Sequence, residues 1–263
     1  MLKNSGPSPE ESAIDLAVQE VGRFDGKLIR SGACDAEFYL PVLLADGRVT
    51  GFRLLVLAQG DQLIPKEASP MHLPACCPNR HINKDGTFCI TWRSRLPIRV
   101  INADNASNWW KTVYRFLQEQ HRAAKKRQWP TTGEWAHGDA ALEQLRAEMA
   151  AAALGSRFSN DLQNGRLTVK KKGDFYRLTG PNGWIYSVWI QFERVATLRQ
   201  LCFCSEGFRK RVVLKSCGNH AKAAADLVLG IVGREREERR FWKALEGHAC
   251  CETMNNCPLS DRN

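Results

Sequence analysis

Side chains that could carry chemistry gather between residues 76 and 89, around the turn signal Asp85-Gly86. An Asp-Gly pair reverses the chain readily because glycine tolerates positive φ angles. Cys89 follows this turn, so we expect its thiol to lie on an ordered strand or ledge, with the polar loop folded back towards it. A nucleophile needs such a position, and so does a metal ligand. The candidate residues are Cys76, Cys77, Asn79, His81, Asn83 and Cys89.

Three interpretations of this segment compete. In the first, Cys89 is a nucleophile that carries an acyl group as a thioester, and an amide or imidazole of the loop stabilises the oxyanion formed during transfer. The candidates for that second role are Asn79, His81 and Asn83. In the second, a closed zinc site is built from Cys76, Cys77, His81 and Cys89, although adjacent cysteines are not a standard ligand pair. In the third, the two adjacent cysteines are buried small hydrophobic residues.

The segment resembles the active-site loop of ubiquitin-conjugating enzymes. In that family a His-Pro-Asn loop leads through a Gly-x-x-Cys turn to the thioester cysteine. The stretch from Gly86 to Cys89 matches the turn, and Cys89 matches the catalytic cysteine. Asn79-Arg80-His81 occupies the place of the His-Pro-Asn triplet, so His81 falls where the family's oxyanion asparagine stands. This departure leaves His81, Asn79 and Asn83 as alternatives for the oxyanion role.

The longer sequence pattern is similar to the divergent bacterial branch of that family, some members of which carry a cysteine-rich extension. Beyond the loop it includes Trp109-Trp110, Trp129-Pro130 and His137-Gly138-Asp139. The resemblance covers roughly the first 155 residues and is most specific around Cys89. It implies that Cys89 accepts a ubiquitin-like modifier from an activating enzyme and passes it to an amine on a protein target. It further suggests an operon with a deconjugating peptidase, serving phage defence.

Polar residues beyond the cysteine are candidates for the acceptor side of such a site. In conjugating enzymes an acidic residue there helps to desolvate or deprotonate the incoming lysine. Glu134, His137 and Asp139 could do so here, and helix capping or loop packing is the alternative for each of them. His137 could also pair with Cys89 as a cysteine-protease dyad, a weaker hypothesis because its distance from the thiol is not given by the sequence.

Composition narrows the function classes. The chain has 263 residues, an apolar fraction of 43% and a net charge of +10, which permit one or two domains with a core. The positive residues are spread along the chain, so nucleic acid is an unlikely partner. Signal-peptide and membrane-spanning patterns are both missing, which predicts a cytoplasmic protein with reduced cysteines. The Trp109-Trp110 pair is expected in the core.

The apolar patterns predict an α+β fold. Its N-terminal domain, residues 1–155, is ubiquitin-conjugating-like and catalytic, with a helix, an antiparallel meander, the active-site loop and C-terminal helices. Residues 156–263 form a small cysteine-rich α+β accessory domain. We expect an N-terminal helix that ends near residue 24. We expect further helices at 104–127, 139–154, 219–231 and 234–245. We expect strands at 27–30, 37–44, 50–58, 166–170, 175–178 and 184–192, with further strands at 201–205 and 210–215.

The second half carries six cysteines and a nearby histidine that together predict a zinc site. Cys202 and Cys204 alternate as on a strand, so both thiols would face one side. The stretch from Cys217 to His220 resembles a metal knuckle, and a loose tail is ordered well by a metal. The spacing matches no standard finger, so reduced, unliganded thiols are the alternative. The tentative ligands are Cys202, Cys204, Cys217, His220, Cys250, Cys251 and Cys257.

Catalysis of the conjugating type needs no cofactor, and zinc in the second half would be structural. The competing function is a non-catalytic zinc-binding protein that binds a protein or a nucleic acid. The positive net charge and the cysteine-histidine clusters in both halves support it. Metal stoichiometry separates these functions, because a metal that survives a Cys89→Ser change is not held by Cys89.

Overall fold

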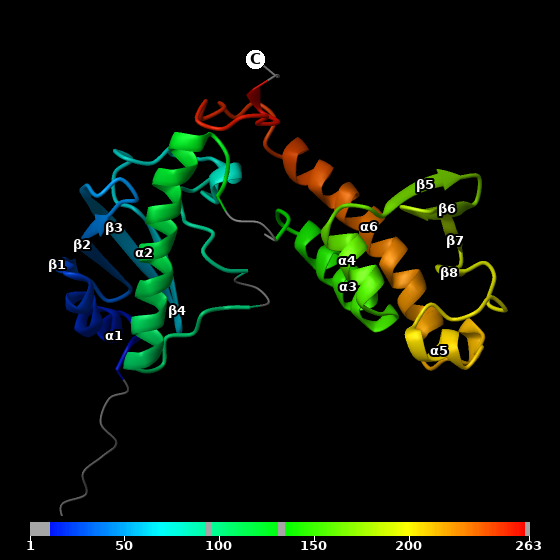
Figure 1. The fold of residues 1–263 in the computed structure, drawn as a ribbon. Helices are drawn as coiled ribbons and strands as arrows, with labels where there is room; N and C mark the ends of the chain where they lie inside the picture. Colours follow the sequence, from blue (N-terminus) through cyan, green and yellow to red (C-terminus); the bar gives the residue numbers. More distant parts are fainter. Residues whose placement is uncertain (1–10, 93–95, 131–134, 261–263) are drawn as a thin grey trace, which may run out of the picture. The chain divides into compact units, whose positions relative to one another are not determined.

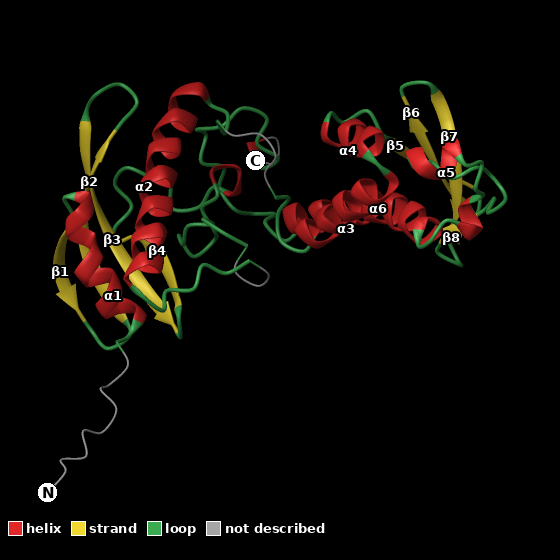
Figure 2. Cartoon of the chain, turned by 60° about the horizontal axis from the view of Figure 1, so that its bottom comes forward, coloured by secondary structure: helices red, strands yellow, loops and turns green. Residues whose placement is uncertain are grey.

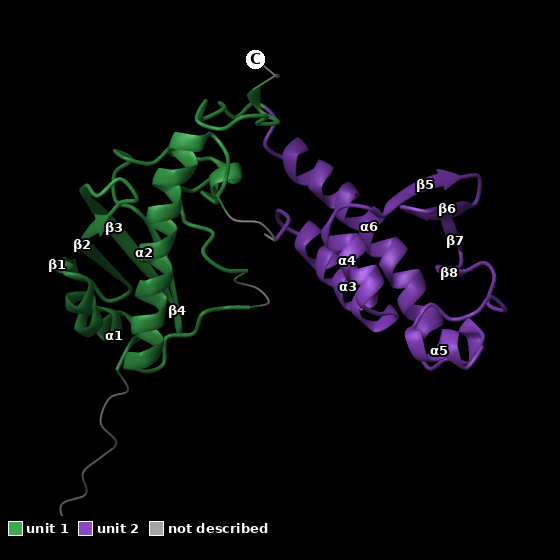
Figure 3. Ribbon diagram, viewed as in Figure 1, with its two compact units in different colours: residues 1–131, 247–263 green, residues 132–246 purple. Residues whose placement is uncertain are grey.

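The computed structural model describes residues 11–92, 96–130 and 135–260. Runs of strands and runs of helices follow one another along the chain, which is the α+β arrangement that the sequence predicts (Figure 1). Two compact units divide the chain: residues 1–131 with 247–263, and residues 132–246 (Figure 3). The C-terminal segment therefore belongs to the first unit, which the predicted division after residue 155 did not include.

The first unit is built on an antiparallel meander in the order β1-β2-β3-β4. Phe38 and Leu40 alternate with more exposed residues and are fully buried, since one face of the sheet forms the core. The fourth strand was not expected because it follows a tight turn and contains Pro65. The strands are β1 (Lys27–Ser31), β2 (Asp35–Leu43), β3 (Val49–Gln59) and β4 (Gln62–Glu67).

Two helices, α1 (Ala13–Glu20) and α2 (Ala103–Lys126), pack together against this sheet (Figure 2). The 3-10 turn η1 (Val21–Phe24) extends the first of them. The indole N–H of Trp110 donates to the carbonyl of Ala17 at 2.9 Å, and the Trp110 ring meets Phe38 edge-on with centroids 5.0 Å apart. The predicted core position of the tryptophan pair is confirmed, because both rings are fully buried.

The second unit contains four helices and a four-stranded antiparallel sheet in the order β5-β6-β7-β8. A Cβ atom at Gly230 would lie 2.8 Å from the backbone of α3, so glycine permits the close approach of α3 and α6. The hydroxyl of Tyr186 donates to the carbonyl of Ala224, which joins the sheet to α6. The elements are α3 (Ala140–Leu154), α4 (Ser156–Gln163), β5 (Thr168–Lys172), β6 (Phe175–Gly180), β7 (Gly183–Trp189), β8 (Arg194–Val195), α5 (Ser205–Arg209), η3 (Leu214–Ser216) and α6 (His220–Lys243).

Two expectations for the second unit differ from the structure. The strands predicted at 201–205 and 210–215 reduce to one isolated bridge between Leu201 and Val213. The chain turns between them because the N–H of Gly207 donates to Cys204 Sγ and starts helix α5. The two helices predicted after residue 219 form one continuous helix, α6. No helix in the described part of the chain combines the length and the low polarity that crossing a bilayer requires.

Candidate functional site

The backbone around Cys89 is held from both sides while its side chain is exposed. The N–H of Phe88 donates to the carbonyl of Pro65 at 2.8 Å, and the Phe88 ring stacks on Phe116 of α2 with centroids 4.8 Å apart. The N–H of Cys89 itself donates to the carbonyl of His81 at 2.8 Å. A thiol at this position is ordered through its backbone and open to a large partner, as a nucleophile requires.

The predicted turn at Asp85-Gly86 is present, and its hydrogen bonds explain its geometry. The Asp85 carboxylate accepts from the N–H of Thr87 at 3.0 Å and from its hydroxyl at 2.6 Å. Gly86 has φ +79°, a value that favours glycine. The side-chain amide of Asn83 donates to Thr87 Oγ1 at 3.0 Å, so Asn83 also holds the turn.

The other two candidates for the oxyanion role lie in the same loop. Asn79 is half-buried on the 3-10 turn η2 (Pro78–Arg80). His81 follows with φ +54°, and its ring meets Trp129 edge-on with centroids 4.7 Å apart. The structure thus brings Asn79, His81 and Asn83 into the loop before Cys89, and the carbonyl of His81 contacts Cys89 directly.

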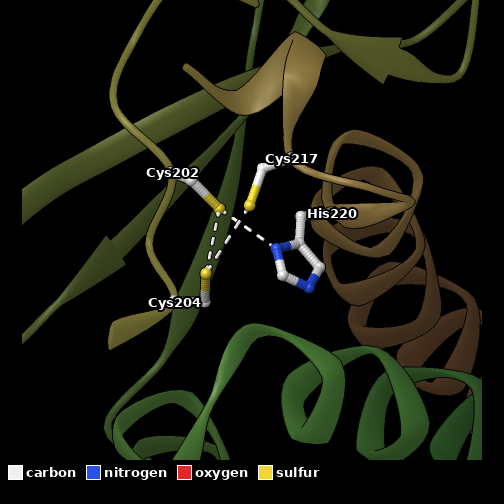
Figure 4. A group of neighbouring side chains, drawn as sticks. All are labelled: Cys202, Cys204, Cys217 and His220. Atoms are coloured by element: carbon white, nitrogen blue, oxygen red, sulfur yellow. Dashed lines mark hydrogen bonds between the residues drawn. The ribbon is translucent and has the colours of Figure 1, made fainter. Parts of the chain in front are cut away.

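A cluster of four metal-ligating side chains lies in the second unit (Figure 4). Their ligand atoms all lie within 4.8 Å of one another. Cys204 Sγ is 3.6 Å from Cys202 Sγ and 3.7 Å from Cys217 Sγ, and Cys202 Sγ is 3.1 Å from His220 Nδ1. Among the described residues, no second group of three or more metal-ligating side chains lies this close together. The zinc site considered for Cys76, Cys77, His81 and Cys89 is therefore not formed.

The donor set and the space around it are compatible with zinc. Tetrahedral zinc with Zn–S bonds of about 2.3 Å places its sulfur ligands about 3.8 Å apart, close to the separations here. A Cβ atom at Gly207 would lie 2.7 Å from Cys202 Cβ, 3.0 Å from Cys204 Sγ and 3.1 Å from Cys217 Sγ, so the cluster requires glycine there. Burial alone would raise the pKa of Cys204, but hydrogen bonds from Gly207 N–H and the neighbouring thiols lower it.

Comparison with protein families decides what kind of chain this is. Residues 24–131 match the prokaryotic E2 domain, and residues 136–259 match the cysteine-rich domain that lies C-terminal to E2 domains. The chain belongs to a bacterial E2-like family with a cysteine-rich C-terminal domain. Comparison with curated proteins and with solved structures finds no match.

Membership of this family gives the E2-like chain a ubiquitin-conjugating-like role in the broad sense. It also implies contact with an activating enzyme and a ubiquitin-like modifier. The predicted resemblance and the predicted fold class, an E2-like domain followed by a cysteine-rich domain, are confirmed.

The residues proposed for the acceptor side of the E2-like site have structural contacts of their own. His137 Nδ1 lies 2.5 Å from Glu238 Oε1, and the imidazole stacks on Phe241 with centroids 4.7 Å apart. Asp139 precedes α3 as its N-cap residue, but its exposed side chain accepts no capping hydrogen bond. Glu134 lies outside the described residues. Cys89 belongs to the first unit and His137 to the second, so the dyad stays a hypothesis from the sequence alone.

The structure separates the three tail cysteines of the E2-like chain from the cluster in the second unit. Cys250, Cys251 and Cys257 belong to the first unit. Cys251 Sγ lies 2.8 Å from Cys77 Sγ, and Cys250 and Cys251 line a hollow together with Cys76. The predicted seven-residue ligand set is therefore divided, and its tail members lie beside Cys76 and Cys77 of the loop that precedes Cys89.

The thiol pair has a strong electrostatic asymmetry. The hydrogen bond between the two thiols lowers the pKa of Cys251 to about 5, against the effect of burial. Contacts with Thr253 and the charge of Arg80 lower it further. The same hydrogen bond, together with burial, raises the pKa of Cys77. The contact between the two thiols therefore favours ionisation of Cys251 over ionisation of Cys77.

Sequence reasoning missed Arg80, which is only 3% exposed. Its Nε donates to Gln120 Oε1 at 2.8 Å, its Nη2 to the Gln120 carbonyl at 3.0 Å, and its Nη1 to Thr253 Oγ1 at 3.2 Å. Burial lowers the pKa of the guanidinium. Arg80 joins the loop before Cys89, α2 and the C-terminal segment. No sequence signal could have found this network, since its members lie 40 and 173 residues apart.

Proposed function

We propose that Cys89 carries a ubiquitin-like modifier as a thioester. The Cys89 thiolate attacks the thioester carbonyl that joins the modifier to the activating enzyme, and the cysteine thiolate of that enzyme leaves. An amine of the target protein then attacks the new thioester, an amide bond forms, and Cys89 leaves as thiolate. One bond forms and one breaks in each step, and the amine proton passes to solvent or to a base.

The observation that carries this proposal is the position of Cys89 within the matched E2 domain. Its side chain is exposed at the end of a loop whose backbone is fixed by hydrogen bonds from Phe88 and Cys89. A thioester exchange between two proteins needs a thiol that a protein-sized partner can reach, on a backbone that does not move when the oxyanion develops.

The polar loop before Cys89 supplies the candidates for oxyanion stabilisation. Each transfer step passes through a tetrahedral intermediate whose negative oxygen needs hydrogen-bond donors. His81 is tied to Cys89 through its carbonyl, whereas the Asn83 amide is engaged by Thr87. We propose that one of His81, Asn79 and Asn83 donates to the oxyanion. Glu134, His137 and Asp139 remain proposals for the acceptor side.

A thioester assay tests the carrier role. The full chain is incubated with ATP, a charged activating enzyme and its ubiquitin-like modifier, and adducts are separated on non-reducing gels. We expect a thiol-labile adduct with the unaltered chain and a thiol-resistant oxyester with Cys89→Ser. Cys34→Ser is the matched control, because Cys34 is an exposed thiol of the same unit. An adduct that stays thiol-labile in Cys89→Ser and disappears in Cys34→Ser would contradict the proposal.

A second role follows from the cluster of Cys202, Cys204, Cys217 and His220. We propose that it holds one structural zinc ion that stabilises the cysteine-rich domain, because closed three-cysteine, one-histidine sites are typical of structural zinc. Metal analysis should find zinc that is lost in Cys217→Ser and retained in Cys89→Ser. Retention in both variants would remove this cluster as the site. Zinc lost only with Cys89→Ser would favour the non-catalytic zinc-binding function.

The cellular setting is proposed from the family alone. We propose that the chain works in the cytoplasm, in a bacterial conjugation operon with an activating enzyme and a deconjugating peptidase, and that this operon restricts phage. All ten cysteines are free thiols, which suits a reducing compartment. Phage plating on cells with the intact operon, compared with cells carrying Cys89→Ser, tests the defence role. Equal plating would contradict it.

A further inference from the structure

One face of the sheet in the second unit is basic and aromatic. Residues directly opposite each other in antiparallel strands share a face of the sheet. Lys172 lies opposite Phe175, Phe175 opposite Trp189, and Trp189 opposite Arg194. One row of side chains therefore crosses all four strands, with a cation at each end and two aromatic rings between them.

A second row runs parallel to the first. Lys170 lies opposite Arg177, and Arg177 lies opposite Ser187. The indole N–H of Trp184 donates to Ser187 Oγ at 3.3 Å, so Trp184 lies beside this row, and its side chain is 59% exposed. We call the two rows with Trp184 the basic-aromatic face. Its four cations are all exposed, and strands β5–β8 contain neither aspartate nor glutamate.

The opposite face of the same sheet packs in the core of this unit. Leu178, Tyr186, Val188 and Val195 are buried there, and Tyr186 hydrogen-bonds to Ala224 of α6. The sheet therefore needs only one apolar face to fold. Large exposed aromatic side chains on the other face have no role in this packing, and clusters of this kind mark interaction sites.

Two rings of the basic-aromatic face, Phe175 and Trp189, continue into Phe192 in the turn after β7, and we include Phe192 in the face. The ring centroids of Phe175 and Trp189 are 3.9 Å apart, and those of Trp189 and Phe192 are 6.0 Å apart. The guanidinium carbon of Arg194 lies 5.1 Å from the Phe192 ring centroid. Phe192 is 53% exposed. This series presents rings together with cations that can reach phosphate groups.

We propose that the basic-aromatic face binds single-stranded nucleic acid. Bases would stack on Trp184, Trp189 and Phe192, and the four cations would contact the phosphates. Sheet residues in adjacent strands lie about 4.8 Å apart, and alternate residues along a strand about 6.6 Å apart, which suits successive bases. An acidic protein would be attracted by the cations alone and would leave the exposed rings of Trp184 and Phe192 without a partner. The proposal is independent of the thioester chemistry at Cys89.

Fluorescence anisotropy of the full chain with a labelled oligo-dT of about 15 nucleotides tests this proposal. We expect saturable binding at about 50 mM salt that weakens at about 200 mM, with a log–log slope no steeper than about −3 for four phosphate contacts. Trp184→Ala and Phe192→Ala should each weaken binding about tenfold, as expected for loss of one stacked base. Lys172→Glu should weaken it further and flatten the slope.

Two matched controls separate the face from general charge and general hydrophobicity. Lys171→Glu changes the neighbouring residue, whose exposed side chain lies on the opposite face, and should change binding less than Lys172→Glu. Phe208→Ala removes an aromatic ring that is 67% exposed on α5, and should leave binding unchanged. Cys89→Ser should bind like the unaltered chain.

Three outcomes would overturn the proposal. One is an absence of binding at low salt. Another is equal weakening by Lys171→Glu and Lys172→Glu, which would make the attraction non-specific. The third is full competition by poly-glutamate together with no effect of Trp184→Ala or Phe192→Ala, which would indicate an acidic protein partner. All of these variants alter exposed side chains, and circular dichroism of each variant verifies that it is folded.

Discussion

The Sγ atoms of Cys77 and Cys251 lie 2.8 Å apart, although 174 residues separate them in the chain. The contact places the C-terminal segment on the loop that leads to Cys89. The same segment receives a hydrogen bond from Arg80 through Thr253. The loop before the proposed thioester cysteine is therefore stabilised by residues from the far end of the chain, which belong to the same compact unit.

The Arg80 network should contribute measurably to stability. Arg80→Met leaves the buried Gln120 side chain without its donor, and an unsatisfied buried polar group costs about 1–3 kcal/mol. Urea unfolding should show a free energy of unfolding reduced by that amount. Arg127→Met is the control, since Arg127 contacts Asn255 of the same segment at an exposed position, and it should change stability by less than about 0.5 kcal/mol. Equal losses would mean that the buried network has no special role.

The thiol pair should make stability depend on pH. Cys251 has a pKa of about 5 in the folded chain, below the usual thiol value of about 8.5, so its contribution is lost as pH falls from about 8.5 towards 5. The raised pKa of Cys77 acts in the opposite sense, because the unfolded chain alone releases that proton above about pH 8.5. Stability measured against pH should therefore pass through a maximum near pH 8.

Removing the thiol of Cys77 provides the control. In Cys77→Ala, alkylation of Cys251 by iodoacetamide should require a higher pH than in the unaltered chain, because the thiolate has lost the group that stabilises it. Peptide mass spectrometry at pH values between about 5 and 9 follows the reaction at this one cysteine. An unchanged pH profile would show that the contact with Cys77 does not lower the pKa of Cys251.

Gly207 should be required for metal binding in the second unit. In Gly207→Ala the new methyl group would meet Cys202 and Cys204 at 3.0 Å or less, so the ligands must shift. We expect zinc affinity, measured by chelator competition, to fall about 10–100-fold, as it does when residues that orient the metal ligands are changed. Gly22→Ala is the control, because no atom lies within 4 Å of its new Cβ, and it should bind zinc normally. Equal affinities in all three proteins would remove the cluster as a zinc site.

The oxyanion donor can be ranked by three single substitutions, Asn79→Ala, His81→Ala and Asn83→Ala. Loss of the donor should slow transfer of the modifier from Cys89 to free lysine about 10²–10³-fold, whereas the other two changes should have smaller effects. Asn83→Ala should also lower thermal stability, because the Asn83 amide holds Thr87 in the turn. Transfer rates that stay within about tenfold of normal in every variant would exclude side-chain donation from this loop.

The local pattern of the chain predicted the features that depend on near neighbours. The Asp85-Gly86 turn, the first three strands and helix α2 follow from turn chemistry and apolar periodicity, which act over a few residues. The match to the turn before Cys89 was also local, since four adjacent residues carry it. These parts of the fold and of the candidate site needed no knowledge of distant contacts.

The tertiary structure decided the features that depend on long-range packing. Seven candidate ligands could be grouped in several ways, and only folding places Cys202, Cys204, Cys217 and His220 together while Cys251 pairs with Cys77. The burial of Arg80 has the same origin, because its partners come from α2 and the C-terminal segment. Local spacing identified the pairs Cys202–Cys204 and Cys217–His220 as ligands, but only the packing of whole elements brings the two pairs together and keeps Cys251 apart from them.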